Sequence, residues 1–227
     1  MRSPRVVVGV DFDGTLAPIV SHPDLAVPLP ESMASLARLT AAPNVTVAVV
    51  SGRALADLRA RLGDLPGAVL IGEHGNDYGR DEPAEAVIGD AHTMLHELAG
   101  DRPGITIEVK PRSLSFHYRN LSDVEAEASL GRIRAWAAVH GVSVLEGKKV
   151  IELTTASRNK GEAMRELADG ASIVYFGDDT TDESVFEILG PDDIGVKVGS
   201  GPTAAAFRVE DVYGVARILN TMALASH

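Results

Sequence analysis

The chain has 227 residues, a formal net charge of −11 and no cysteine, which excludes disulfides and thiolate metal sites. Hydrophobic residues make up 45% and charged residues 23%, which is typical of a folded globular protein and excludes a disordered one. Such an acidic chain is a poor candidate for nucleic-acid binding, and none of its apolar runs is long enough for a signal peptide or a membrane span. We therefore expect a cytoplasmic monomer that binds neither nucleic acid nor membranes.

Short runs rich in β-branched residues predict the strands of a parallel sheet. They are mostly apolar rather than alternating, as expected for strands that are covered on both faces. Helical patterns lie between them, for example at Leu55, Leu58 and Leu62, and a closing helix is predicted over 212–224. The fold class is therefore α/β, with a doubly wound parallel sheet. The predicted strands are Val6–Val10, Val45–Val50, Ala68–Ile71, Ile173–Phe176 and Ile194–Val198.

The middle third of the chain breaks this alternation. Its predicted order is α-β-β-α-β-β, with turns at Pro111-Arg112 and Glu146-Gly147. We interpret it as a small domain over residues 81–154, inserted into a core formed by residues 1–80 and 155–227. The predicted elements are helices over 83–98 and 124–139 and strands over 105–109, 114–118, 142–145 and 150–153.

The strands of the insert alternate between apolar and polar side chains. One face can therefore bury against the two helices, while the other carries mixed donors and acceptors. That polar face either meets water or recognises a polyhydroxylated ligand. The predicted apolar face holds Ile105, Ile107, Val109, Leu114, Phe116, Tyr118, Ile151 and Leu153. The predicted polar face holds Thr106, Glu108, Lys110, Ser115, His117, Arg119, Lys148, Val150 and Glu152.

Three polar motifs follow predicted core strands, and a fourth opens the helix with which the chain re-enters the core. They are DFDGT at 11–15, SGR at 51–53, NKGE with Lys160 and GDDTTDE at 177–183. Because ligands of open α/β sheets bind beyond the carboxyl ends of the strands, we expect these motifs to converge there. The convergence would bring Ser51, Arg53 and Lys160 to an acidic cluster of Asp11, Asp13, Asp178, Asp179 and Asp182.

Such a cluster fits phosphoryl transfer. Carboxylates favour a hard cation such as Mg²⁺, which takes one or two carboxylates together with a phosphate. Asp11 can attack phosphorus as a nucleophile and form an aspartyl phosphate, and Asp13 can protonate the leaving oxygen and later activate water. The groups that can hold the phosphoryl oxygens are Ser51, Lys160 and the backbone amides of Gly14 and Thr15.

Each motif alone has an ordinary structural explanation. DFDGT is compatible with an Asx turn, and GDDTTDE with an acidic helix N-terminus. Ser and Gly are common after strands, and Lys160 alone would be a solvated helix residue. The four motifs in this order and in these settings favour an active site over four independent coincidences.

The four motifs resemble those of the haloacid dehalogenase-like phosphatase superfamily, and the insert resembles its C2-type cap. Within that superfamily, DFDGTLAPI, GEHG, HYR, EGKKVIEL, NKGEAM and GDDTTDE are similar to the trehalose-6-phosphate phosphatase family. The resemblance implies Mg²⁺-dependent hydrolysis of a disaccharide phosphate, namely trehalose 6-phosphate to trehalose and phosphate, through an aspartyl phosphate.

The resemblance also implies roles for single residues. Asp11 would be the nucleophile and Asp13 the general acid and base, with Arg53 and Lys160 near the phosphate. The metal would be held by Asp11, the backbone carbonyl of Asp13 and Asp178, with Asp182 in support. The residues implied to contact the disaccharide are Glu108, Arg119, Lys148 and Glu152. Glu73 and His74 of GEHG are implied to lie near the site, without an assigned role.

Other activities of related chemistry stay open. The substrate could be sucrose phosphate, mannosyl-3-phosphoglycerate or a pseudo-disaccharide phosphate, and a sugar phosphomutase would use Asp11 and Asp13 alike. Asp13 argues against a dehalogenase, which needs no acid two residues after its nucleophile. A transport ATPase would have Thr at that position, and a non-catalytic sensor would be expected to have lost a motif residue.

Overall fold

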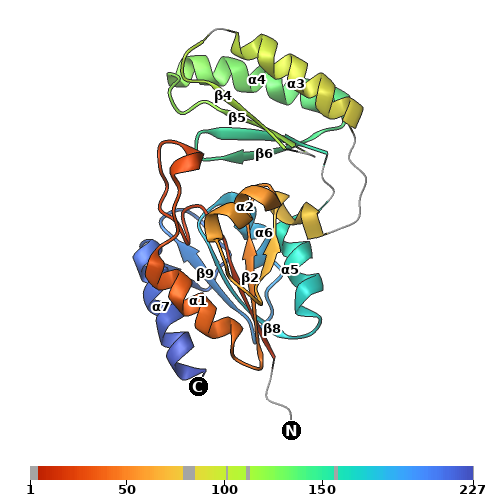
Figure 1. The fold of residues 1–227 in the computed structure, drawn as a ribbon. Helices are drawn as coiled ribbons and strands as arrows, with labels where there is room; N and C mark the ends of the chain where they lie inside the picture. The colour runs from red at the N-terminus through yellow and green to blue at the C-terminus, as the bar shows by residue number, and fades with distance from the viewer. Residues whose placement is uncertain (1–4, 79–84, 101, 111–112, 156–157, 227) are drawn as a thin grey trace. The chain divides into compact units, whose positions relative to one another are not determined.

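The computed structural model describes residues 5–78, 85–100, 102–110, 113–155 and 158–226 (Figure 1). The chain divides into two compact units, which we name the core, Met1–Gly79 with Arg158–His227, and the cap, Arg80–Ser157. The expected boundaries after residues 80 and 154 lie one and three residues from these divisions.

The core contains a six-stranded parallel sheet in the order β10-β9-β8-β1-β2-β3. Central β1 pairs on both sides, with Val10 aligned to Val49 and to Phe176. The doubly wound α/β fold is thus confirmed. β10 was not expected, because a three-residue strand with an exposed Phe207 carries too short a pattern. The strands are β1 Val6–Val10, β2 Val45–Val50, β3 Val69–Ile71, β8 Ser172–Gly177, β9 Ile194–Val198 and β10 Phe207–Val209.

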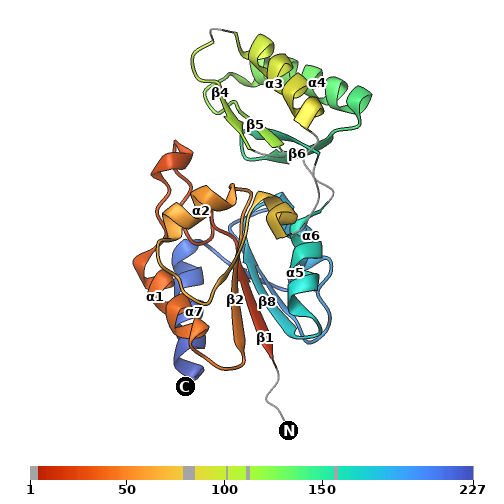
Figure 2. The same cartoon turned by 45° about the vertical axis from the view of Figure 1, so that its right-hand side comes forward.

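Helices cover both faces of this sheet (Figure 2). Val8 and Val10 pack in one cluster with residues of α1, α2 and α7, while Val7 packs in another with residues of α5 and α6. The helix α1 was not expected from the sequence, although Pro30 occupies its favoured first position. The helices are α1 Pro30–Thr40, α2 Leu55–Leu62, α5 Lys160–Ala168, α6 Glu183–Phe186 and α7 Val212–Ala225. Short 3₁₀ turns are η1 Pro23–Leu25, η2 Glu73–Tyr78 and η3 Thr180–Asp182.

The position of β1 explains where a site can form. From β1 the chain continues to the neighbouring β2 on one side, and it returns after the cap to β8 on the other. This reversal of strand order is the switch point at which open α/β sheets bind ligands. Asp11 and Asp178 follow the two strands that meet there.

The cap contains a four-stranded antiparallel sheet in the order β4-β5-β7-β6, together with the helices α3 and α4. Helix α4 begins at a capping box of Ser122 and Glu125 and ends at Gly141, whose φ of 66° closes it. The elements are α3 Glu85–Ala99, β4 Thr106–Val109, β5 Ser113–His117, α4 Asp123–His140, β6 Ser143–Gly147 and β7 Val150–Thr154. Across the described parts of both units, every helix is too short or too polar to cross a membrane.

Two details of the cap differ from expectation. Strand β6 continues to Gly147, which pairs with Val150, so the turn lies at Lys148-Lys149 instead of Glu146-Gly147. Val109 was expected on the buried face but is 58% exposed, because it ends the edge strand β4, where no further strand flanks it. The expected turn at residues 111–112 lies outside the described residues.

Candidate active site

The loop after β1 fixes the two aspartates of DFDGT. The amide of Asp11 donates to the carbonyl of Phe176 at 2.9 Å, so Asp11 still belongs to the sheet. Shortly afterwards the amide of Gly14 donates to the carbonyl of Ala17 at 2.8 Å and closes the turn. Asp11 is buried, whereas the side chain of Asp13 is 38% exposed. The two carboxylates therefore begin from the same loop in different environments.

Gly14 allows this loop to approach β8. Its φ of 81° lies in the left-handed region, and a Cβ there would stand 2.3 Å from Oδ2 of Asp178. Any larger residue would push the Asp178 carboxylate away. The glycine of DFDGT thus brings the loop after β1 directly against a carboxylate that follows β8.

Lys160, at the start of α5, contacts Asp11 of the loop after β1. The helix begins at a capping box of Asn159 and Glu162, which places Lys160 at its first position. The Lys160 Nζ donates to Oδ1 of Asp11 and to Oδ1 of Asp182, both at 2.8 Å. Its side chain is only 2% exposed, so the alternative explanation of a solvated helix residue does not apply.

Asp182 is held entirely by protein donors. Besides Lys160, its Oδ1 accepts from the hydroxyl of Tyr175 at 2.8 Å, and its Oδ2 accepts from the amide of Asp179 at 2.9 Å. Its side chain is fully buried. Three donors on one buried carboxylate fit a residue that supports its neighbours. Asp179 caps the following turn instead, since its Oδ1 accepts from the amide of Thr180.

The electrostatics of the cluster favour a cation. Carboxylate oxygens of Asp11, Asp178 and Asp182 lie within 4.8 Å of one another, and all three residues are buried. Burial raises the pKa of Asp11 well above its usual value; Lys160 opposes this, and the charges of Asp182 and Asp178 add to it. Lys160 contacts Asp11 and Asp182 of this group. The three carboxylates form a hard-oxygen donor set that fits a divalent cation.

Lys160 and Tyr175 also respond to this environment. Burial alone would lower the pKa of Lys160, but Asp11 and Asp182 outweigh it and raise the pKa, so the lysine stays protonated. Burial, and then the charge of Asp182, raises the pKa of Tyr175 well above its usual value. The tyrosine therefore keeps its hydroxyl proton and donates a hydrogen bond to Asp182.

The SGR motif reaches a different carboxylate. Ser51 is buried directly after β2, and its Oγ accepts from the amide of Arg53 at 3.2 Å. Arg53 Nε donates to Oδ2 of Asp13 at 2.7 Å, and Nη2 donates to Oδ1 at 2.8 Å. The resemblance implies that Arg53 lies near a phosphate. In this structure its guanidinium donates to both carboxylate oxygens of Asp13.

Arg53 also pairs with a residue that sequence reasoning missed. Its Nη1 donates to Oδ2 of Asp57 at 2.7 Å, and Asp57 lies four residues further on, in the first turn of α2. Arg53 precedes α2, so the helical i,i+4 spacing that the sequence does show joins Asp57 to Arg61 instead. Tyr175 was missed too, although a phenol in a buried strand needs a partner for its hydroxyl.

Glu73 and His74 form an unusual turn beside the ends of β2 and β3. Both have left-handed backbones, with φ of 45° and 57°. The amide of His74 donates to the carbonyl of Ser51 at 3.0 Å, and that of Glu73 donates to the carbonyl of Arg53 at 2.9 Å. Non-glycine residues in this conformation are strained and cluster at functional sites. The turn is thus fixed to the backbone of SGR.

The hydroxyl of Thr15 is a further polar group of this region. Its Oγ1 is buried and has no hydrogen-bond partner among the described residues. Buried hydroxyls are normally satisfied, so an unsatisfied one beside the cluster is compatible with a ligand contact.

The polar face of the cap sheet carries a buried ion pair. Lys110 Nζ donates to Oε2 of Glu152 at 3.1 Å, and Ser115 Oγ donates to the same oxygen at 3.1 Å. Glu108, Ser115 and Glu152 lie in one row across β4, β5 and β7. These contacts show a partly buried polar network rather than a uniformly solvated face.

The four cap residues implied by the resemblance have different settings. Glu108 contacts Nε2 of His117 at 3.1 Å. Burial would raise the pKa of Glu108, but this hydrogen bond and the charge of Lys110 lower it below its usual value. Lys148 lies in the turn between β6 and β7, and Arg119 lies two residues beyond β5; both are exposed.

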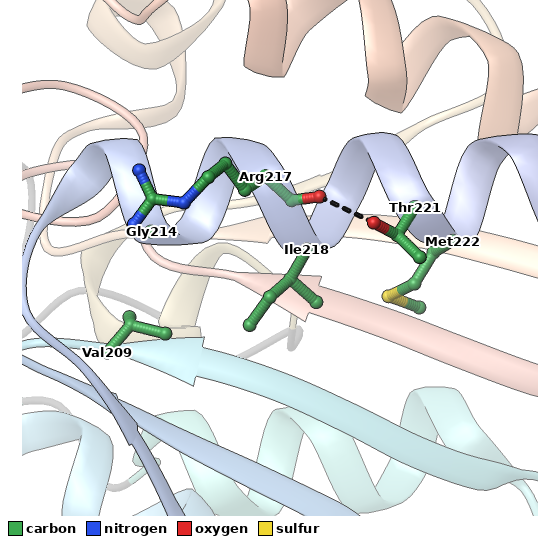
Figure 3. Close-up of a pocket in the computed structure, with 6 residues that line it drawn as sticks. All are labelled: Val209, Gly214, Arg217, Ile218, Thr221 and Met222. Atoms are coloured by element: carbon green, nitrogen blue, oxygen red, sulfur yellow. Dashed lines mark hydrogen bonds between the residues drawn. The ribbon is translucent and has the colours of Figure 1, made fainter.

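A pocket elsewhere in the core has a different character. Figure 3 shows it along α7 beside the end of β10, with the hydroxyl of Thr221 donating to the carbonyl of Arg217 at 2.9 Å. Its lining is largely apolar, and none of the lining residues belongs to the carboxylate cluster. The lining residues are Val209, Gly214, Arg217, Ile218, Thr221 and Met222.

Comparisons with known proteins agree on one family. The family described as trehalose-phosphatase matches residues 9–212. A bifunctional trehalose-6-phosphate synthase/phosphatase of Thermoproteus tenax is 35% identical over 97% of this chain and 32% of its own length. A trehalose-phosphate phosphatase of Mycobacterium ulcerans is 35% identical over 97% of this chain and 62% of its own. The chain thus spans less than two thirds of either relative.

Solved structures agree with the fold. The C-terminal domain of trehalose-6-phosphate phosphatase from C. albicans superposes with a TM-score of 0.85 at 23% identity. The match covers 98% of this chain and 93% of that one.

Proposed function

The chain belongs to the trehalose-phosphatase family, and from this premise we propose that it hydrolyses trehalose 6-phosphate to trehalose and phosphate. The observation that carries the proposal is the buried pair of Asp11 and Lys160, with Asp13 two residues further along the same loop. A nucleophile, a fixed cation and an acid then meet at the switch point of the sheet.

In the proposed reaction, a carboxylate oxygen of Asp11 attacks phosphorus and the bond to the sugar oxygen breaks. Asp13 gives its proton to that oxygen, so trehalose leaves as the neutral alcohol. Asp13 then takes a proton from water as the water attacks the aspartyl phosphate, which releases phosphate and restores Asp11. Lys160, Ser51 and the amides of the loop after β1 hold the phosphoryl oxygens during both steps.

The proposed cofactor is Mg²⁺. Asp11, Asp178 and the backbone carbonyl of Asp13 would hold it, and Asp182 would support the site by holding Lys160. When bound, the cation supplies positive charge against the phosphoryl oxygens. The three buried carboxylates, whose oxygens lie within 4.8 Å of one another, support this assignment.

Removal of the metal by chelation should abolish activity, because without the cation the buried carboxylates repel the dianionic substrate. We expect EDTA to abolish phosphate release and added Mg²⁺ to restore it. Isothermal titration should also show weaker Mg²⁺ binding by Asp178→Asn than by the wild type, independently of turnover. Full activity after exhaustive chelation would contradict the proposed metal site.

We propose that the polar face of the cap binds the sugar. Glu152 is prearranged by Lys110 and Ser115, and Glu108 by His117, so these carboxylates can accept from hydroxyls with little loss of side-chain freedom. Lys148 and Arg119 would add donors from the adjoining connections.

Glu152→Ala and Lys148→Ala should separate sugar recognition from chemistry. Each is expected to lower kcat/KM for trehalose 6-phosphate about tenfold or more. A tenfold loss corresponds to about 1.4 kcal/mol less stabilisation of the transition state. The hydrolysis of p-nitrophenyl phosphate, which has no sugar hydroxyls, should stay nearly unchanged. Because Glu152→Ala removes a carboxylate that accepts from the buried Lys110, Glu152→Gln provides a second test.

Glu127→Ala is the matched control in the cap. Glu127 lies on α4, is 69% exposed and pairs with Arg134. We expect both substrates to be unaffected by its loss. Equal losses on both substrates from the Glu152 and Lys148 variants would show that these residues support the fold or the chemistry instead of sugar recognition.

A panel of sugar phosphates tests the substrate. Phosphate release from trehalose 6-phosphate should exceed that from sucrose phosphate, mannosyl-3-phosphoglycerate and monosaccharide phosphates. A preference for another member would correct the substrate while keeping the reaction, and a requirement for a sugar bisphosphate would indicate a mutase.

We propose a cytoplasmic monomer that binds neither nucleic acid nor membranes. The net charge of −11 supports the part of this proposal that concerns nucleic acid. Light scattering during gel filtration and cell fractionation test the other parts.

A further inference from the structure

We propose that Asp57 is a positioning residue, which acts through Arg53 to aim the carboxylate of Asp13. The inference rests on the proposed function, because it concerns the delivery of a proton to the leaving oxygen. Among the residues that the structure describes, the Asp57 carboxylate contacts Arg53 and Arg61 and not Asp11, Asp178 or Asp182.

The guanidinium of Arg53 is shared between two carboxylates. Its Nε and Nη2 grip both oxygens of Asp13, while Nη1 donates to Asp57 and Nη2 also donates to the carbonyl of Pro23 at 2.9 Å. A guanidinium is planar, so an acceptor on Nη1 fixes the rotation of the edge that faces Asp13. The ring of Phe12 stands 5.1 Å from Cζ and limits tilting of the plane.

Asp57 is in turn fixed by a second arginine. Arg61 Nε donates to Oδ2 of Asp57 at 2.9 Å, and Nη2 lies 2.8 Å from Oδ1. Arg61 also donates to the carbonyl of Asp24 at 3.0 Å, which ties α2 to the turn η1. Burial would raise the pKa of Asp57, but hydrogen bonds from Arg61 and Arg53 outweigh it and lower the pKa. Asp57 therefore stays ionised in the first turn of α2.

Loss of Asp57 disturbs the position of the Asp13 carboxylate. Nη1 of Arg53 loses its acceptor, so the guanidinium can rotate away from its present plane, and its edge then no longer holds both oxygens of Asp13 in place. A displaced Asp13 carboxylate is poorly placed to protonate a poor leaving group such as a sugar alkoxide, whereas p-nitrophenolate leaves without a proton.

The test compares leaving groups in Asp57→Asn and Asp57→Ala. We expect kcat/KM for trehalose 6-phosphate to fall about tenfold or more, since misplaced catalytic groups cost this much, while kcat/KM for p-nitrophenyl phosphate changes less than about twofold. The ratio kcat/KM reports the steps up to formation of the phosphoenzyme, where the leaving group matters. In an Asp13→Ala background, Asp57→Asn should cause no further loss on the sugar phosphate.

Asp24→Asn is the control. The substitution changes a carboxylate of the same network whose side chain is 77% exposed. Among the described residues, Asp24 pairs with Arg61 and not with Arg53. We expect it to leave both substrates unaffected.

Equal losses on both substrates, an unchanged sugar reaction, or a full additional loss in the Asp13→Ala background would each overturn the inference. So would failure of both Asp57 variants to fold, because Asp57 would then serve the N-terminus of α2. A wild type that is inactive on every sugar phosphate would instead refute the proposed function, and the inference with it.

Discussion

Asp11→Asn should lower phosphate release from trehalose 6-phosphate by at least about three orders of magnitude, because an amide cannot form the acyl phosphate. The variant should stay folded: burial already raises the pKa of Asp11, so a neutral side chain of the same shape suits the site. Acid quenching during turnover should trap labelled phosphate on the wild-type protein and none on the variant.

Asp169→Asn controls for the loss of an aspartate. Asp169 ends α5 in a left-handed conformation that asparagine tolerates, and its side chain is 88% exposed. We expect full activity from this variant. Appreciable Mg²⁺-dependent turnover by Asp11→Asn, with a phosphoenzyme still formed, would remove Asp11 from the role of nucleophile.

Lys160→Met should cost both stability and activity. The substitution removes two 2.8 Å bonds and leaves Asp11 and Asp182 buried without their cation. Breaking such a buried pair costs about 3–5 kcal/mol, which urea denaturation at pH 7 would measure as a loss in the free energy of unfolding. The loss of a fixed charge beside the transferring phosphate should lower kcat about 10²–10³-fold.

Lys149→Met is the matched comparison for the stability effect. Lys149 pairs with Asp123 at 2.7 Å, but the two side chains are 44% and 93% exposed. Because solvent screens exposed ion pairs, we expect little change in the free energy of unfolding. If Lys160→Met were as stable and as active as the wild type, neither the pairing nor the proposed catalytic role of Lys160 would hold.

The strands of the core could be read from the sequence because burial on both faces demands continuous apolar runs. The runs at Val6–Val10, Val45–Val50 and Ile194–Val198 form strands with the expected bounds. The helix α1 escaped prediction because only part of its apolar face is buried, with two serines among its four buried residues. β10 escaped because three residues at a sheet edge carry no pattern.

For the candidate site, the sequence predicted which motifs come close together but not which side chains pair. Parallel strands place their carboxyl ends at one edge, so the sequence alone predicts that the residues after β1, β2 and β8 come close together. It does not predict which of them pair. Arg53 grips Asp13, although the same residue types would equally allow it to stay beside a phosphate.

The sequence by itself determined the fold class, the inserted cap and the residue types gathered at the switch point, because side-chain periodicity and motif order are local properties of the chain. Only the tertiary structure decided the partners. Lys160 and Asp11 are 149 positions apart, and their contact depends on how α5 packs beside β1. Likewise, alternation along the sequence places Lys110 and Glu152 on one face, but the register of β4 and β7 with β5, which lies between them, makes the two residues a buried ion pair. Pairing across such separations is set by packing geometry, which no short window of sequence contains.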